Sequence, residues 1–94
     1  MLEKQTSKGV LKYRMPNILE AYDLLESSGV SVGANALSLK RNIIKSMEPL
    51  LDFSQLGFSS YFELLGDIEN MLNPLSEIAD EIIDKTFDAF KKKS

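Results

Sequence analysis

The chain has 94 residues, a length that suits one domain, and its 44% hydrophobic and 27% charged residues are an ordinary globular balance. The net charge of −3 argues against nucleic acid as a partner. The sequence contains no Cys and no His, which excludes thiol chemistry, disulfides, Ser-His-Asp and Cys-His catalysis, and the commonest metal ligands.

The first sixteen residues are expected to form a β-hairpin arm. Thr6–Gly9 has the composition of a turn. The run after the turn alternates in the period of a half-buried strand, and its inner side consists of Leu11, Tyr13 and Met15. We therefore predict strands at Leu2–Gln5 and Val10–Met15. Two strands alone are marginal in water, so this hairpin must pack on helices.

A helix is predicted over Ile18–Ser28. Asn17 and Glu20 have the spacing of a capping box, and Gly29 suits a left-handed C-terminal cap. The expected buried face consists of Ile18, Ala21, Tyr22 and Leu25. The segment Val30–Asn35 contains a second glycine, but it lacks the Lys-Ser/Thr of a phosphate-binding loop and is interpreted as a connector.

A second helix is predicted over Ala36–Met47, because Pro49 disfavours a helical Glu48. Its apolar stripe consists of Ala36, Leu39, Ile43 and Met47. Its basic patch, which is expected to be solvated or to pair with the acidic last helix, consists of Lys40, Arg41 and Lys45. The apolar segment Leu50–Phe58 is expected to cross the core as irregular structure or a single helical turn.

A third helix is predicted over Tyr61–Leu72, since Ser60 and Glu63 form another capping box. Its expected buried face consists of Phe62, Leu64, Leu65, Ile68, Met71 and Leu72. Asn73 and Pro74 suit an N-cap and a first helical position, so they are expected to end this helix and start the last one.

The last helix, Pro74–Lys92, is predicted to be strongly amphipathic, with an apolar stripe about 180° wide. The centre of the stripe, which should face the core, consists of Leu75, Ala79 and Ile82. Ile83 and Phe87 lie on one margin and are predicted to meet another chain, either a second copy or a client helix. In the alternative interpretation, the hairpin or residues 50–58 cover this margin.

Together these patterns predict a mainly α fold: one domain over residues 1–94, with about four helices and a short N-terminal β-hairpin, divided into an arm (1–16) and a helical body (17–94). Acid pairs such as Asp67 with Glu69 lie on predicted solvated faces, where a raised pKa is not expected. We therefore expect no enzyme activity, cofactor, metal or small-molecule substrate. No signal peptide and no apolar run of about 20 residues is visible, which predicts a cytoplasmic protein without membrane contact.

Residues 11–30, LKYRMPNILEAYDLLESSGV, resemble the opening of tail assembly chaperones of long-tailed bacteriophages. Those proteins begin with a short strand or hairpin, an Arg-x-Pro turn and an amphipathic helix with an early Glu. The matching positions here are Arg14, Met15, Pro16 and Glu20. The later segments MEPLLDF, SSYFELLGDIENM and PLSEIADEIIDKTF are similar in outline to the family's acidic helical ending.

This resemblance implies a non-enzymatic protein of the host cytoplasm that binds the tape-measure protein, keeps it soluble and recruits tail-tube subunits. It also implies a homo-oligomer, because many members self-associate, and it makes Arg14 and Pro16 candidate partner-binding residues beside Ile83 and Phe87. The first alternative is a generic helical adaptor or antitoxin-like binding module, which gene neighbours would distinguish. The second is an enzyme or enzyme subunit.

Overall fold

The computed structural model describes residues 1–27 and 36–91, apart from the side chains of residues 25, 27, 36–38 and 87–91. Its elements are β1 (Leu2–Thr6), β2 (Gly9–Tyr13), α1 (Ile18–Ser27), α2 (Ala36–Ser46), η1 (Glu48–Leu50), β3 (Leu51–Asp52), η2 (Ser54–Leu56), α3 (Tyr61–Gly66) and α4 (Ile68–Lys91). The predicted mainly α fold with four helices and an N-terminal hairpin is confirmed. The predicted cap at Gly29 and the connector over residues 30–35 lie outside the described residues.

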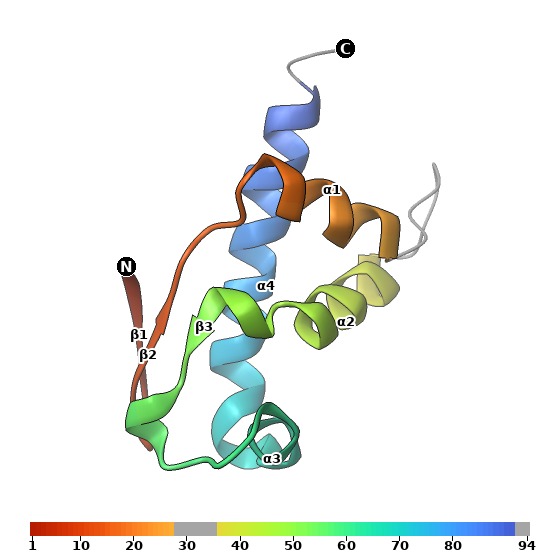
Figure 1. The fold of residues 1–94 in the computed structure, drawn as a ribbon. Helices are drawn as coiled ribbons and strands as arrows, with labels where there is room; N and C mark the ends of the chain where they lie inside the picture. Colours follow the sequence, from red (N-terminus) through yellow and green to blue (C-terminus); the bar gives the residue numbers. More distant parts are fainter. Residues whose placement is uncertain (28–35, 92–94) are drawn as a thin grey trace.

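The other elements are arranged around α4, the long helix that runs through the molecule in Figure 1. Its inner stripe is fully buried and consists of Leu75, Ile78, Ala79 and Ile82. The hairpin lies on one side of α4 and α2 on another, while α3 packs beside its first turns. The prediction that Leu75, Ala79 and Ile82 face the core is therefore confirmed.

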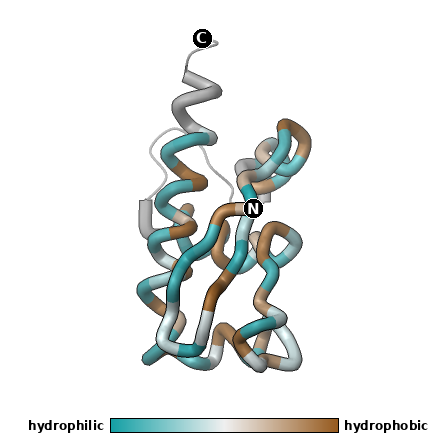
Figure 2. Tube along the Cα trace, turned by 90° about the vertical axis from the view of Figure 1, so that its left-hand side faces the viewer, coloured by the Kyte–Doolittle hydropathy of each residue, from teal (hydrophilic) through white to brown (hydrophobic). Residues whose placement is uncertain are grey.

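β1 and β2 form the predicted antiparallel hairpin, closed by a two-residue turn at Ser7 and Lys8. Gly9 follows the turn at a φ of 137°, in a region that side chains rarely adopt, and a Cβ there would lie 3.4 Å from the Gln55 carbonyl oxygen. Leu11 and Tyr13 point inward and are buried, as the alternation predicts. The hairpin runs along α4 in Figure 2.

The segment over residues 50–58 crosses the core as predicted, but it adds a strand that the sequence pattern did not indicate. Between the short turns η1 and η2, β3 pairs antiparallel with the end of β2, Tyr13 lying opposite Leu51. Leu50 and Leu56 are buried, and three further apolar side chains pack half-buried against the core: Leu51, Phe53 and Phe58. The sheet therefore has three strands in the order β1-β2-β3.

The predicted break at Asn73 and Pro74 is wrong, because the chain breaks at Asp67 and Pro74 lies inside α4. The Asp67 amide donates to the Leu64 carbonyl and ends α3, while the Asp67 carbonyl accepts from the Met71 amide and starts α4. The Asn70 side-chain amide also donates to the Asp67 carboxylate at 3.1 Å. Asp67 therefore lies at the junction of the two helices, and Pro74 lies inside the continuing helix, where it removes one backbone donor.

This break explains a second error, the predicted buried face of the third helix. Leu64 and Met71 are buried and Leu65 is half-buried, as expected, but Phe62 is 87% exposed, Ile68 66% and Leu72 58%. Because the helix is interrupted at Asp67, the residues on its two sides do not share one continuous face. Half of the predicted stripe therefore lies on the surface.

The predicted inner face of α1 is confirmed at Ala21 but wrong at Ile18 and Tyr22. Ala21 and Leu24 are buried, whereas Ile18 and Tyr22 point outward; the side chain of Leu25 lies outside the described residues. In α2 the prediction is confirmed for Leu39 and Ile43, with Met47 buried directly after the helix. The basic face of α2 does pair with α4, since the Lys40 ammonium lies 3.1 Å from the Asp80 carboxylate.

Candidate protein-binding site

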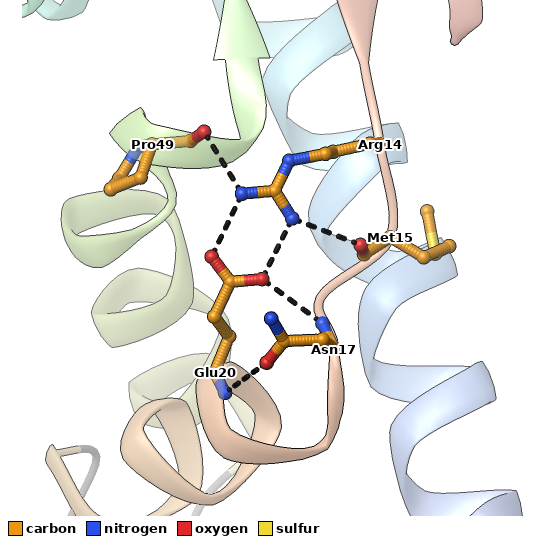
Figure 3. Close-up of polar contacts among 5 residues, drawn as sticks. All are labelled: Arg14, Met15, Asn17, Glu20 and Pro49. Atoms are coloured by element: carbon orange, nitrogen blue, oxygen red, sulfur yellow. Dashed lines mark hydrogen bonds and ion pairs between the residues drawn. The ribbon is translucent and has the colours of Figure 1, made fainter.

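Arg14, which is part of the family resemblance, lies in the short connection between β2 and α1. The Arg14 amide donates to the Leu50 carbonyl at 3.0 Å, which extends the pairing beyond β2. The Arg14 guanidinium donates two bonds to the Glu20 carboxylate, at 2.7 and 2.8 Å, and longer ones of 3.5 Å to the Met15 and Pro49 carbonyls (Figure 3). Such a bidentate pair fixes direction as well as distance.

Glu20 also forms the predicted capping box with Asn17 at the start of α1, which is confirmed. Its carboxylate accepts from the Asn17 amide at 3.0 Å, and the Asn17 side-chain oxygen accepts from the Glu20 amide at 2.9 Å (Figure 3). The hydrogen bonds from Arg14 and then from Asn17 lower the pKa of Glu20 to about 2. We call this set of contacts between Arg14, Asn17 and Glu20 the Arg14–Glu20 clamp. The clamp fixes the direction in which α1 leaves the sheet.

The clamp holds α1 with an apolar face turned to solvent. Leu19 is 74% exposed, Ile18 70% and Tyr22 53%. The ten residues of α1 also include three acids, at positions 20, 23 and 26, and no basic residue. We call Ile18, Leu19 and Tyr22 with their acidic neighbours the α1 face.

A cleft of about 380 Å³ lies beside α1, at the end of α2. Its lining residues are Glu20, Asp23, Leu24, Ser46, Pro49 and Leu50. Apolar side chains from α1 and η1 therefore lie beside two carboxylates here. The α1 face and this cleft together offer a partner apolar area bordered by negative charge, which suits a segment that is apolar and basic.

The four predicted partner-binding residues are divided between two parts of the molecule. Arg14 belongs to the clamp, and Pro16 lies half-buried between β2 and α1. Ile83 is half-buried on α4 and packs against the core, while the side chain of Phe87 lies outside the described residues. The roles of all four in partner binding stay predictions.

Sequence reasoning missed Ile18, Leu19 and Tyr22 as surface residues, because helical spacing alone places Ile18 and Tyr22 on a buried face. The sequence feature that could have indicated their exposure is Glu20, six residues after Arg14. Its carboxylate is hydrogen-bonded both to Arg14, after β2, and to Asn17, at the start of α1, and these bonds limit how α1 can rotate about its axis.

Within residues 1–27 and 36–91, no group of three or more His, Cys, Asp or Glu side chains is placed to hold a metal ion. None of the helices in that part of the chain is long and apolar enough to cross a membrane. Comparisons with protein-family models, curated proteins and solved structures find no match. The residues at the site offer a partner apolar contact, hydrogen bonding and negative charge.

Proposed function

We propose that this chain is a non-enzymatic tail assembly chaperone of a long-tailed bacteriophage, which binds the tape-measure protein and tail-tube subunits. The observation that carries the proposal is the α1 face, three large apolar side chains held outward by the residues that carry the family resemblance. Arg14 and Glu20 thus have a physical reason to occur together: they present a helix that a client can bind.

The client that fits the α1 face is an amphipathic helix with basic residues along its border. Covering a large apolar side chain stabilises a complex by roughly 1.5–3 kcal/mol when burial is complete. Asp23 and Glu26 are exposed beside the apolar residues, and they favour Lys or Arg on the client. Because the clamp already orders α1, little of the binding free energy is lost in ordering this helix.

The direct test is co-expression with the tape-measure protein encoded in the same genome. The chain should raise the soluble fraction of the tape-measure protein and co-purify with it. Leu19→Glu combined with Tyr22→Glu should abolish both effects while the circular dichroism spectrum is unchanged. Gln55→Glu is the matched control, since it places a new charge on the exposed part of η2, away from α1, and should bind as the wild type does.

Three outcomes contradict parts of this proposal. If the tape-measure protein neither binds nor gains solubility, the phage chaperone function is wrong. If a different protein then binds through the α1 face, the chain is a helical adaptor or antitoxin-like module, and its gene neighbours should not be tail genes. If the doubly substituted variant binds the tape-measure protein as the wild type does, the α1 face is the wrong site.

A further inference from the structure

The outer edge of β1 is an open edge of the sheet. β1 is the first strand in the order β1-β2-β3, and in the part of the chain that the structure describes β2 is its only strand partner. The two strands pair residue for residue over Leu2–Thr6, so no bulge interrupts the edge. Glu3 and Gln5 are exposed along it, and the hairpin faces the viewer in Figure 2 with α4 behind it.

The backbone groups that point out of this edge belong to Glu3 and Gln5. In an antiparallel hairpin with a two-residue turn, the pair that closes the turn is hydrogen-bonded, and so is every second pair after it. Thr6 opposite Gly9 closes this turn. The amides and carbonyls of Glu3 and Gln5 therefore point away from β2, with the spacing that one more antiparallel strand requires.

The outer face of the sheet carries a row of alternating charges that ends at this edge. Lys12 of β2 lies opposite Asp52 of β3 on one side and opposite Glu3 of β1 on the other. The hydrogen bonds from Ser54 and, further, the charge of Lys12 lower the pKa of Asp52. Because opposite charges on neighbouring strands stabilise a sheet, the position beyond Glu3 favours Lys or Arg.

The row on the inner face ends at the same edge in an apolar residue. Leu51 of β3 lies opposite Tyr13 of β2, and Tyr13 lies opposite Leu2. Tyr13 is buried and Leu51 half-buried, whereas Leu2 is 42% exposed. An apolar residue beyond Leu2 would extend this row and cover that side chain. Lys4, the charged residue of β1 on this face, is already paired with Glu77 of α4 at 3.2 Å.

We propose that the edge of β1 binds an extended segment of another protein as a fourth, antiparallel strand, with Lys or Arg opposite Glu3 and an apolar residue opposite Leu2. These two residues of the segment are adjacent in sequence, because successive side chains of a strand alternate between the faces. The site is separate from the α1 face and does not depend on the proposed client binding, since a helix has no free backbone groups to offer along its length.

A second copy of this chain fits the edge poorly. Antiparallel pairing of two β1 strands over their full length puts Lys4 opposite Lys4. The shift that brings Leu2 opposite Lys4 puts Glu3 opposite Glu3. Like charges directly opposite each other destabilise a sheet, so the pattern of β1 selects a different strand.

An NMR titration of the full chain with the capped peptide Thr-Val-Thr-Thr-Lys-Val-Thr tests the proposal. Its Lys should lie opposite Glu3 and its second Val opposite Leu2. Peptide at up to millimolar concentration should slow hydrogen exchange of the Glu3 and Gln5 amides, while exchange of the Lys4 amide, which faces β2, is unchanged. No slowing at either amide overturns the proposal. It is also wrong if both amides are protected without peptide and the chain sediments as a dimer, because a second copy then occupies the edge.

Exchanging charges tests the residue expected opposite Glu3. Glu3→Lys should weaken binding of this peptide roughly threefold or more, and the peptide with Glu in place of Lys should bind this variant better than it binds the wild type. Glu48→Lys makes the same charge change at an exposed position of η1 and should bind the original peptide as the wild type does. Misfolding cannot produce the recovery with the exchanged peptide. Equal binding of both peptides by both proteins would contradict a basic residue opposite Glu3.

Gln5→Pro tests whether the backbone of the edge binds the peptide. The proline removes a donor that the added strand needs and none that the hairpin uses, because the Gln5 amide points away from β2. Binding should be lost while the circular dichroism spectrum is unchanged. Gln5→Thr keeps the amide and is the matched control. If Gln5→Pro binds the peptide as the wild type does, the peptide does not add as a strand and the proposal is wrong.

Discussion

α4 and α1 are both amphipathic helices, but α4 buries its apolar stripe whereas α1 exposes several of its apolar side chains. The inner stripe of α4 is closed off by the hairpin, α2 and α3, and at Ile78, Ala79 and Ile82 no surface is left accessible. Among its described side chains, α1 buries Ala21 and Leu24 and turns Ile18, Leu19 and Tyr22 outward. Apolar spacing is therefore sufficient to orient a helix at the centre of this small domain, but not one at its edge.

The difference follows from what holds each helix. α4 is positioned by burial on several sides, so its rotation is set by the hydrophobic effect, which has no direction of its own. α1 contacts the body over a small area and is positioned by the Arg14–Glu20 clamp, whose hydrogen bonds have defined directions. Substitutions in the two helices should therefore have very different effects.

The largest effect is expected in the inner stripe of α4. Ile78→Ala should lower the free energy of unfolding by about 2–5 kcal/mol, because the cavity it leaves is enclosed on all sides. Urea unfolding at neutral pH measures this change. Ile18→Ala is the matched control on α1 and should change the free energy by about 0.5 kcal/mol or less. Equal losses in the two variants would show that α1 is packed as tightly as α4.

Pro74→Ala should stabilise the chain by about 2–3 kcal/mol. A proline inside a helix costs about 3 kcal/mol, whereas the proline also stabilises by restricting the unfolded chain, a contribution of up to about 1 kcal/mol. The net gain should raise the urea midpoint without changing its slope. A loss of stability would instead indicate that the break predicted from the sequence at Asn73 and Pro74 is the correct one.

The clamp should contribute only weakly to the free energy of unfolding, since Arg14 is partly exposed and exposed ion pairs are weak. A double-mutant cycle of Arg14→Ala and Glu20→Gln measures this coupling energy directly. Both single variants should also speed amide hydrogen exchange in α1 while exchange in α4 is unchanged. A coupling energy near zero would mean that α1 is oriented by packing alone.

The pair of Arg14 and Glu20 should also make the stability of the folded chain depend on pH in the acidic range. The pKa of Glu20 is about 2 in the folded chain and 4.5 when unperturbed, so its contribution is complete above about pH 4.5 and is lost as the pH falls toward 2. Stability of the wild type should therefore decline more steeply across this interval than that of Glu20→Gln. Parallel profiles for the two proteins, measured by urea unfolding, would exclude a role for this carboxylate.

The smallest effect is expected on the α1 face. Leu19→Gln replaces an exposed side chain with a polar one of similar size and helix propensity, so the free energy of unfolding should change by about 0.5 kcal/mol or less. Thermal and urea unfolding check this expectation. A loss above about 1 kcal/mol would show that Leu19 packs on the body, and the α1 face could not then serve as a client site.

Sequence patterns predicted most elements of the fold because local rules govern them. The alternation around Leu11 and Tyr13, and the capping boxes at Asn17 and Ser60, depend on residues within a few positions of each other. The break at Asp67 could not be predicted in the same way, because Asn73 and Pro74 offered an equally good local signal. The strand at Leu51 exists only because β2 lies beside it.

The candidate site depended even more on long-range placement. The resemblance points to Arg14 and Glu20, and the capping-box spacing also points to Glu20, but the contacts of Arg14 with Glu20 and with Pro49 are a property of the folded chain. The exposure of Leu19 and Leu72 follows from how α1 is held and where α3 ends. Periodicity predicts which face of a helix or strand is apolar. Whether that face is available to a partner depends on which other elements of the folded chain cover it.

The contacts between the hairpin and α4 also set an order of events during synthesis. Tyr13 donates a 2.7 Å hydrogen bond to Glu81, a residue that is translated 68 positions later, and Lys4 pairs with Glu77. At 5–20 residues per second, the hairpin waits on the order of 3–14 s for the helix that it packs against. Throughout that interval Leu11 and Tyr13 have no α4 to cover them. A ribosome that pauses before Glu77 therefore holds a nascent chain whose first strands are open to pairing with neighbouring chains.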